Sequence, residues 1–346
     1  MLNKIKKNIE LELVKFIRIL DEKYKLSIIS PMLHKNLINF LSRPGKRIRP
    51  LLFIIGYKGF SNKNPFNLYR SALSVELLHS FLLIHDDILD NSDMRRGQPA
   101  LHIMLNKRLN QKSQAKSVGM PLALVSGDII YALSIEAFIS IKESPEKKQK
   151  ALLKLLESGF YTGCGEFIEI INSKKPIAQI SRNEIYKTYD YKTAYYTFSA
   201  PLITGAILAG ASSPEIKKLF KFGKYCGRAF QIKDDILGLF GDSKQTGKSG
   251  FTDIKESKKT LLIWHAYNNA TPANKICLQK ILTKNKTTKS DIINARRILK
   301  ETKSLRYCLN LIQAFIQKSI HELKTSNLKK TYKKELIGFC QKILEL

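Results

Sequence analysis

The sequence predicts an all-α protein of roughly ten or more helices. Apolar residues recur every three to four positions between breaks that are rich in Pro and Gly. Alternation with a period of two is rare, and no Asn-Gly or Asp-Gly pair marks a β-hairpin. No linker rich in Gly and Ser divides the chain, so we expect residues 1–346 to form a single helical domain.

The first predicted element is an amphipathic N-terminal helix. In MLNKIKKNIELELVKFIRIL, charged and apolar residues alternate at helical spacing, without the uninterrupted apolar segment of a signal peptide. Residues 74–88 contain neither Gly nor Pro and predict a helix that is apolar on most sides. Three longer helical patterns and a lysine-rich helical C-terminal part follow at 122–141, 150–171, 219–239 and 275–346. Breaks are expected near 42–47, 61–66, 91–99, 143–146, 172–177, 210–214, 241–253 and 268–273.

Composition restricts the class of protein. With 346 residues, of which 44% are hydrophobic, the chain is long enough to bury a large core and too apolar to be disordered. No apolar run approaches the roughly eighteen residues of a membrane span, so we expect no transmembrane helix. The cysteines lie far apart without zinc-site spacing, which favours reduced thiols in a cytoplasmic protein. They are Cys164, Cys226, Cys277, Cys308 and Cys340.

The chain is strongly basic, with 59 Lys and Arg against 29 Asp and Glu and a formal net charge of +30. Such a charge is compatible with binding to nucleic acid or anionic lipid. The lysines are scattered, however, and no nucleic-acid-binding module is recognisable. We therefore do not expect nucleic-acid binding as the primary role.

The first candidate site lies in FLLIHDDILDNSDMRRG, residues 81–97. Residues four apart share a helix face, so Asp86 and Asp90 point the same way, with Asp87 beside them. Two carboxylates about 6 Å apart repel by roughly 3 kcal/mol at an effective dielectric constant of about 20. Because the flanking residues are apolar, either a carboxylate takes up a proton or a cation lies between them. Mg²⁺ prefers oxygen ligands, and Arg95 and Arg96 indicate an anion with phosphate geometry.

A second acidic pair ends another apolar helix in GRAFQIKDDILGLFGD, residues 227–242. Asp234 and Asp235 follow Gln231 by about one turn, and further along the chain come Lys248 and Lys258. Two clusters of this form, each followed by cations, predict a site of several Mg²⁺ ions that binds a polyphosphate.

These motifs resemble those of the trans-prenyltransferases, the isoprenyl diphosphate synthase family of short-chain polyprenyl synthetases, from about residue 40 to 265. The resemblance implies one helical bundle around a central apolar cavity, the isoprenoid synthase fold, and a homodimer. The family's first motif, DDxxD followed by RRG, matches Asp86, Asp87, Asp90, Arg95, Arg96 and Gly97. Its second motif, in the form FQIxDD, matches Gln231, Asp234 and Asp235.

Further matches imply contacts to two substrates. GKRIRP is similar to the family's GKRxRP, which binds isopentenyl diphosphate, here through Lys46, Arg47 and Arg49. His79 lies where the family has another contact to that substrate. YDYKTAYYTFSAP resembles the family's Lys–Thr motif at Lys192 and Thr193. TGKSGFTDIKESKK resembles the stretch that carries Lys248, Asp253 and Lys258.

The sequence departs from the family pattern in two places. The usual third aspartate of the second motif is Gly238, which leaves two carboxylates there and Asp242 or Asp253 nearby. The family's GQxxD segment is GEFIE, with Glu166 and Glu169. The first position of that segment is therefore anionic, while the last keeps its carboxylate.

The resemblance implies that an allylic diphosphate ionises and that its cation alkylates isopentenyl diphosphate. An apolar pocket would exclude water from the cation. The leaving diphosphate would be stabilised by three Mg²⁺ ions together with Arg95, Lys192 and Lys258. Isopentenyl diphosphate would be held by Lys46, Arg49, His79 and Arg96. Thr193 and Gln231 would face the cation without trapping it.

Product length is expected to depend on the helix that carries the first motif. Phe81 and Leu82 precede Asp86 by five and four positions and project along the same side, below it. The bulky Phe81 should stop elongation, and Leu82 is smaller than the second aromatic residue of many farnesyl-forming relatives. The first motif also lacks a two-residue insertion. This combination resembles geranylgeranyl diphosphate synthases, with farnesyl diphosphate as the alternative product.

Alternative functions remain open at this stage. A type I terpene cyclase also uses an Asp-rich helix and Mg²⁺, but it needs no second diphosphate site. GKRIRP and RRG indicate such a site and therefore favour the synthase. A non-catalytic subunit of a heteromeric prenyl synthase would lose acidic residues, whereas this chain keeps both pairs. Three of these features also have explanations that involve no function. His79 and Phe81 could be core residues, and the first motif could be an acidic helix end paired with arginines.

Overall fold

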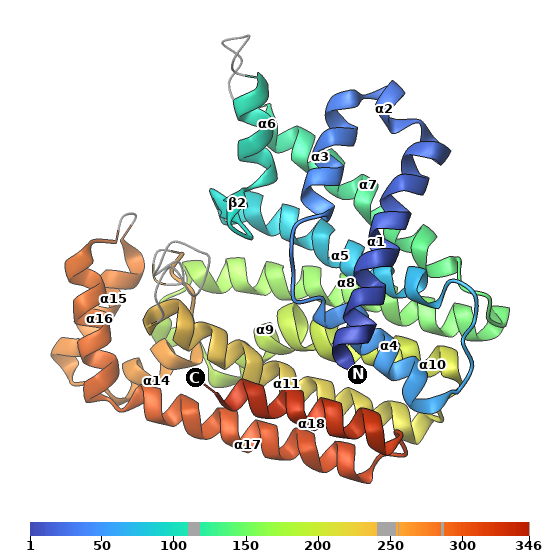
Figure 1. Ribbon diagram of the computed structural model, residues 1–346. Helices are drawn as coiled ribbons and strands as arrows, with labels where there is room; N and C mark the ends of the chain where they lie inside the picture. The colour runs from blue at the N-terminus through green and yellow to red at the C-terminus, as the bar shows by residue number, and fades with distance from the viewer. Residues whose placement is uncertain (110–117, 241–253, 255, 285–286, 346) are drawn as a thin grey trace. The chain divides into compact units, whose positions relative to one another are not determined.

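The computed structural model describes residues 1–109, 118–240, 254, 256–284 and 287–345. Almost all of the ordered elements in these residues are helices, as Figure 1 shows, which confirms the all-α prediction. Within the described residues, strands occur only as one antiparallel pair. The contacts divide the chain into two compact units, one of Met1–Leu155 and Thr204–Ala211 and the other of Leu156–Ile203 and Ser212–Leu346.

The first unit is organised around α5, which packs against α7, α4, α1 and α6. The α5–α7 pair carries the first acidic motif and is visible in the upper part of Figure 1. The helices of this unit are α1 (Leu2–Tyr24), α2 (Leu26–Ile29), α3 (Pro31–Leu41), α4 (Ile48–Phe60), α5 (Leu68–Leu89), α6 (Leu101–Leu109) and α7 (Gly119–Ile139). Its strands are β1 (Met94–Arg95) and β2 (Gln98–Pro99). α8 (Pro145–Lys174) and α10 (Ala200–Ala209) contribute residues to both units.

The N-terminal helix has the amphipathic character that its sequence predicts. Its buried side chains recur at helical spacing and form one apolar face. They are Ile5, Ile9, Leu13, Phe16 and Leu20. By contrast, α5 is buried on most sides over the stretch from Leu68 to Ser80, as expected for an apolar helix between several neighbours.

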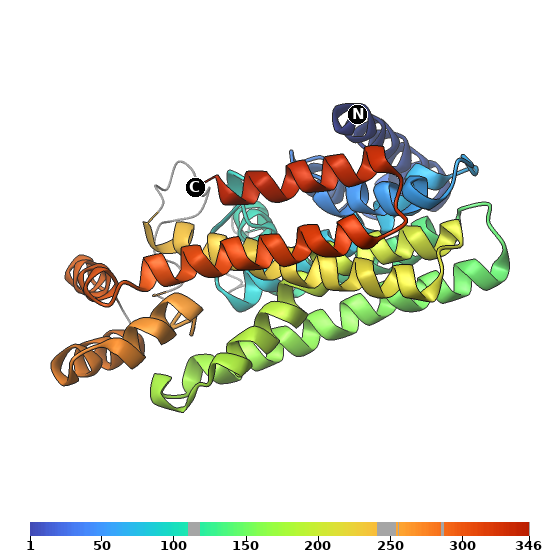
Figure 2. The same cartoon turned by 90° about the horizontal axis from the view of Figure 1, so that it is seen from below.

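The second unit is organised around α11 (Ser213–Phe240), which packs against α17, η2, α14 and α18. Figure 2 shows α17 and α18 as neighbouring helices that run alongside α11. The other elements are η1 (Ile177–Gln179), α9 (Arg182–Thr188), η2 (Tyr189–Ser199), α14 (Leu261–Asn269), α15 (Pro272–Thr283), α16 (Lys289–Glu301), α17 (Ser304–Thr325) and α18 (Lys330–Leu344).

One element of the second unit has an uncommon geometry. The segment Tyr189–Ser199 forms a π-helix, η2, between α9 and α10. π-Helical turns are rare and are found frequently at functional sites. This segment contains the Lys–Thr motif, so the wider helix sets the directions in which Lys192 and Thr193 project.

Within the described residues, α7 is the one helix that is long and apolar enough to cross a membrane by length and composition. The sequence did not predict such a helix. In the structure α7 packs along α5 and buries Ala123, Ile130, Leu133 and Phe138. Core helices of soluble proteins have the same composition, so this feature is weak evidence for a membrane span.

Candidate active site: charged clusters in each unit

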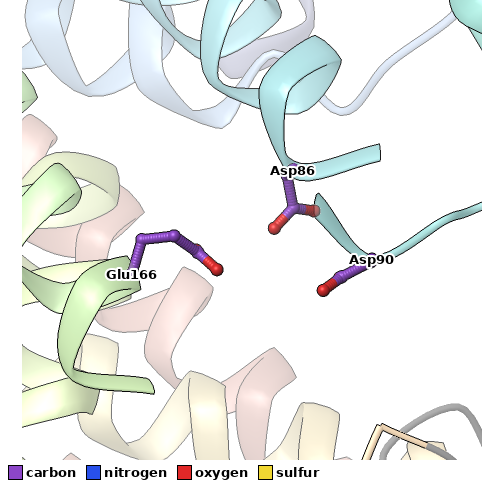
Figure 3. Close-up of side chains that lie close together, drawn as sticks. All are labelled: Asp86, Asp90 and Glu166. Carbon is purple, nitrogen blue, oxygen red and sulfur yellow. The ribbon is translucent and has the colours of Figure 1, made fainter. Parts of the chain in front are cut away.

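The carboxylates of Asp86 and Asp90 point to the same side of the C-terminal end of α5 (Figure 3). A carboxylate oxygen of Asp86 and one of Asp90 lie within 4.8 Å of each other, and both side chains are partly exposed. The C-terminal end of a helix carries negative partial charge. The carboxylates of Asp86 and Asp90 at that end therefore raise the electrostatic free energy unless a cation binds there. Their oxygens fit the ligand preference of Mg²⁺. The pair is therefore a candidate cation site.

Asp87, between these two residues in sequence, faces inward. Its side chain is 1% exposed and accepts a hydrogen bond of 2.6 Å from Arg95 Nε. Arg95 Nη2 also donates to Asp86 Oδ2 at 3.1 Å. Burial lowers the pKa of Arg95, but its hydrogen bond to Asp87 and the charges of Asp87, Asp86 and Asp90 outweigh this, so the pKa is raised. Asp87 thus anchors Arg95, whereas Asp86 and Asp90 present their oxygens outward.

Arg95 is brought to the aspartates by the β1–β2 hairpin. Arg96 and Gly97 form its two-residue turn, with φ of 54° and 74°. Positive φ at both positions is the requirement of a type I′ turn, which glycine meets without steric cost. The buried Arg43 fixes this hairpin, because its Nη1 donates to Arg95 O at 3.2 Å and its Nη2 to Pro99 O at 2.9 Å. This role of Arg43 was not predicted from the sequence.

Glu76 is a buried carboxylate on α5 that the sequence analysis missed. It is 4% exposed and accepts hydrogen bonds from Arg47 Nη1 at 2.6 Å and from Arg96 Nη2 at 3.2 Å. Arg47 is itself buried and also donates from Nε to Glu10 Oε1 at 2.9 Å. The guanidinium of Arg47 is thus engaged by two carboxylates of the first unit. A lone acidic residue inside an otherwise apolar helix is the sequence signal that could have identified Glu76.

His79 lies about one turn after Glu76 on α5. Burial keeps its pKa well below the usual range, and the charges of Arg49, Arg96, Arg95 and Arg47 lower it further. The imidazole is therefore neutral near pH 7. A neutral ring among several guanidinium groups can still donate one hydrogen bond to an anion. Lys46 is exposed and Arg49 partly exposed, and both flank the same helix start at Ile48.

In the second unit, Lys192 of η2 lies between two glutamates of α8. Lys192 Nζ is 2.7 Å from Glu166 Oε2 and also contacts Glu169 Oε2. Glu166, which is drawn in Figure 3, is one of the two positions at which the sequence departs from the family pattern. The adjacent Gly165 permits this approach, because a Cβ there would lie 2.5 Å from Lys192 N. Both glutamates therefore compensate the charge of Lys192.

A hydrogen-bonded chain of side chains connects η2 to the second acidic motif. Thr193 Oγ1 donates to Gln231 Oε1 at 2.6 Å, and Gln231 Nε2 donates to Asp235 Oδ1 at 2.8 Å. The other oxygen of Asp235 accepts from the Tyr189 hydroxyl, which in turn accepts from Leu261 N at 3.0 Å. Burial and the neighbouring Asp235 raise the pKa of Tyr189 well above its usual value. Tyr189 was not predicted as a site residue.

The two aspartates of the second motif are thereby in different environments. Asp235 is 4% exposed and belongs to this hydrogen-bonded chain, whereas Asp234 is exposed on α11. Gly238 supplies no third carboxylate. Asp234 is thus the carboxylate of this motif that is accessible to a cation from solvent.

The basic residues after the second motif are partly described. Lys248 and the neighbouring Asp242 and Asp253 lie outside the described residues. Lys258 Nζ is 2.6 Å from Glu256 Oε2. The sequence analysis did not select the next residue, Lys259, whose Nζ donates to Ser173 O at 3.0 Å and to Ser257 O at 2.8 Å. Burial and the charge of Lys174 lower the pKa of Lys259 to about 8.

The residues selected for product length lie beside α7. The Phe81 ring is 4.4 Å from the His85 ring and 5.2 Å from the Tyr131 ring, measured between centroids. Phe81 and Leu82 are both partly exposed, so neither is a fully buried core residue. Tyr131, which is 37% exposed, adds a second aromatic ring that the sequence analysis did not identify.

Comparison with known proteins agrees with these motifs. The family model described as polyprenyl synthetase matches residues 30–299. The geranylgeranyl diphosphate synthase of Saccharolobus solfataricus is 32% identical over 81% of this chain and 80% of its own length. That of Sulfolobus acidocaldarius is 31% identical over 85% of this chain and 84% of its own length.

A solved structure of a related enzyme has the same fold as this chain. Geranylgeranyl pyrophosphate synthase from Corynebacterium glutamicum, solved with isoprenyl diphosphate and magnesium, superposes with a TM-score of 0.92. It is 25% identical in sequence and covers 100% of this chain and 99% of its own. These findings confirm the family that the two aspartate-rich motifs predict. The chain therefore belongs to the polyprenyl synthetase family and is a prenyltransferase of the trans-isoprenyl diphosphate synthase class.

Proposed function

We propose that this chain condenses an allylic diphosphate with isopentenyl diphosphate to give geranylgeranyl diphosphate, with three Mg²⁺ ions as cofactor. The observation that carries the proposal is the pair of outward-facing carboxylates, Asp86 and Asp90, at the negative end of α5. In a chain of this family, such a pair fits a divalent cation that binds a diphosphate. The proposed metal ligands are Asp86, Asp87, Asp90, Asp234 and Asp235. Of these, Asp87 and Asp235 face inward and accept hydrogen bonds from Arg95 and Gln231.

When bound, Mg²⁺ would neutralise the charge that develops on the departing diphosphate. The chain's own cations would share this task. Arg95 is held rigidly by Asp87, so it needs little reorganisation to interact with an anion beside Asp86. Lys192, Lys248 and Lys258 would contribute further positive charge. Lys192 must exchange a contact with Glu166 or Glu169 to do so.

The isopentenyl diphosphate site is proposed at the start of α4 and the middle of α5. Lys46 and Arg49 would supply charge, and Arg96 would add a guanidinium whose position is set by Glu76. The neutral His79 would donate a hydrogen bond without adding charge. Arg47 would act indirectly, because its guanidinium is occupied by Glu76 and Glu10.

Thr193 and Gln231 would face the allylic cation as uncharged groups. Their mutual hydrogen bond of 2.6 Å fixes both side chains. Neutral hydroxyl and amide groups are weaker nucleophiles toward the cation than carboxylates, and an apolar pocket would exclude water. This arrangement allows the cation to survive until it meets the isopentenyl double bond.

Geranylgeranyl diphosphate is the proposed product for two reasons. The two relatives above, at 32% and 31% identity, are geranylgeranyl diphosphate synthases. Phe81, adjacent to the Tyr131 ring, supplies bulk one turn before Asp86. Farnesyl diphosphate is the alternative product. We further propose a cytoplasmic homodimer without a membrane-spanning helix and without nucleic acid as a partner, and light scattering at micromolar concentration tests the dimer.

The experiment that tests the function is incubation with labelled isopentenyl diphosphate, an allylic primer and Mg²⁺, with products resolved by chain length. We expect twenty-carbon prenyl diphosphate, and no product after Mg²⁺ is chelated. A cyclic hydrocarbon made from the allylic substrate alone would identify a type I terpene cyclase. Incorporation only after a second protein is added would identify a non-catalytic subunit.

A further inference from the structure

A groove in the second unit combines side chains that the family motifs do not account for. It has a volume of about 620 Å³ and lies where the end of α11, the end of α16 and the start of α17 meet. Four apolar residues line it, namely Phe240, Leu299, Leu305 and Leu309. The other described residues in its lining are cationic; these are Arg296, Arg297, Lys300, Lys303 and Arg306.

Within the described residues, three of these cations form no salt bridge. Lys300, Lys303 and Arg306 are exposed, and no salt bridge to any of them occurs within the described part of the chain. The other two are engaged. Arg297 Nη1 is 2.7 Å from Glu301, and Arg296 Nε donates to Leu239 O at 2.9 Å. Three neighbouring positive charges without carboxylates repel one another, and a bound anion would relieve this repulsion.

The start of α17 adds positive potential at the same place. α17 begins at Ser304, and its N-cap residue Lys303 has φ of 54° and makes no side-chain cap hydrogen bond. The side chain of Lys303 therefore accepts no hydrogen bond from the first turn of this 22-residue helix, and the positive end of the helix dipole lies beside Lys303 and Arg306. Helix starts of this kind bind phosphate groups.

The apolar floor distinguishes this groove from an ordinary basic surface. A chain with 59 Lys and Arg against 29 Asp and Glu exposes cations on many faces, so charge alone indicates little. Here Phe240 and Leu309 remain 37% and 36% exposed between the cations. Exposed apolar side chains within a ring of charge fit a ligand that is itself part anion and part hydrocarbon.

We propose that this groove binds a prenyl diphosphate, with the diphosphate on Lys300, Lys303, Arg306 and the start of α17 and the hydrocarbon on Leu305, Leu309 and Phe240. The identity of the ligand rests on the proposed function, because prenyl diphosphate is the product class of this family. The groove volume is within the range of about 300–1,000 Å³ that is typical of small-molecule sites. None of the described residues that line it belongs to DDxxD-RRG or to FQIxDD, although Phe240 follows Asp235 on the same helix, α11. It is a second site at which product can be held.

The test is equilibrium dialysis of radiolabelled geranylgeranyl diphosphate with the full chain in EDTA, so that Mg²⁺-dependent binding does not contribute. Replacing Lys300, Lys303 and Arg306 together by Gln should weaken binding at least tenfold, which is about 1.4 kcal/mol. The control replaces Lys324, Lys330 and Lys334 by Gln, which removes the same charge from the end of α17 and from α18. We expect less than a twofold change in that control. Equal losses in both triple variants would overturn the proposal, because they would indicate non-specific attraction.

A second variant tests the apolar floor. Leu309→Gln should weaken binding of geranylgeranyl diphosphate severalfold and leave binding of inorganic diphosphate unchanged. Inorganic diphosphate that binds as tightly as the prenyl compound would contradict a role for the floor. The groove triple variant could lose binding to phosphatidylglycerol vesicles and keep binding of free geranylgeranyl diphosphate. That result would overturn the proposal and identify the groove as a membrane-binding surface.

The dialysis needs no turnover, so its outcome is separable from that of the proposed function. The groove variants lie outside the catalytic motifs and should elongate isopentenyl diphosphate at the initial rate of the unmodified chain. A chain that binds geranylgeranyl diphosphate through the groove but makes no product would refute the function and leave the groove intact. If the chain is active and the two triple variants bind geranylgeranyl diphosphate equally well, only the proposal of a second site is refuted.

Discussion

Removing the buried carboxylate of Glu76 should strongly destabilise the first unit. Glu76→Gln keeps the size of the side chain but removes the charge that faces two guanidinium groups. Arg47 and Arg96 lie 2.6 and 3.2 Å from Glu76 Oε1, and the side chains of Arg47 and Glu76 are 1% and 5% exposed. Breaking a buried ion pair by removing one partner costs about 3–5 kcal/mol. Because Arg47 keeps its ion pair with Glu10 in this variant, we expect the free energy of unfolding to fall by the lower end of this range, about 3 kcal/mol.

Glu10→Gln is the matched control, because it removes the other carboxylate of the same arginine. The Glu10 side chain is 40% exposed, so its interaction with Arg47 is screened and should be worth less than about 1 kcal/mol. The assay is equilibrium unfolding in urea of the unmodified chain and the two variants, with the change in midpoint converted by a common slope. Equal destabilisation by the two variants would show that burial does not control this cluster and would refute the reasoning.

Three further predictions concern the metal, the product and pH. Asp86→Ala should lower kcat roughly a thousandfold, because it removes an outward-facing carboxylate from the candidate cation site, and turnover near normal would argue against that site. Phe81→Ala should lengthen the product, resolved by chromatography of the dephosphorylated alcohols; an unchanged product from a folded, active variant would place the floor elsewhere. The pKa of His79 in the folded chain is well below its ordinary value of 6.5. As pH falls below about 6.5, His79 therefore binds a proton in the unfolded chain but not in the folded chain, and the free energy of unfolding decreases. His79→Gln should reduce this loss by up to about 1.4 kcal/mol per pH unit. A fall in the urea midpoint between pH 7 and pH 5.5 that is as large in this variant as in the unmodified chain would count against a neutral His79.

Local periodicity was sufficient to predict most helices of this chain. The apolar positions of residues 2–24 repeat at helical spacing, and the structure buries that face of α1. The short hairpin could not be predicted in this way, because two-residue strands have no measurable alternation. Gly97, at φ of 74°, is its one sequence signal. Nothing in the sequence indicated that Tyr189–Ser199 would be a π-helix.

The charged partners of the site illustrate a second limit. Adjacent aspartates are visible in the sequence, but their partners are determined by tertiary contacts between distant residues. Arg47 and Glu76 are separated by 29 positions, and Tyr189 and Asp235 by 46. The distinction between inward-facing Asp87 and outward-facing Asp86 likewise required the position of Arg95. Sequence motifs therefore predict the residue types of the candidate site, and packing determines which of their atoms are accessible.

The type I′ turn has a consequence for how this site can change. Two consecutive arginines leave the hairpin toward different acidic residues, Arg95 toward Asp86 and Asp87, and Arg96 toward Glu76. One additional residue in the turn would shift the strand register and redirect both side chains together. In the proposed site, where Arg95 and Arg96 contact different substrates, the recognition of both would thus be tied to the length of a single turn. Insertions at this hairpin should be much less tolerated than substitutions, because no single compensating change can restore both contacts.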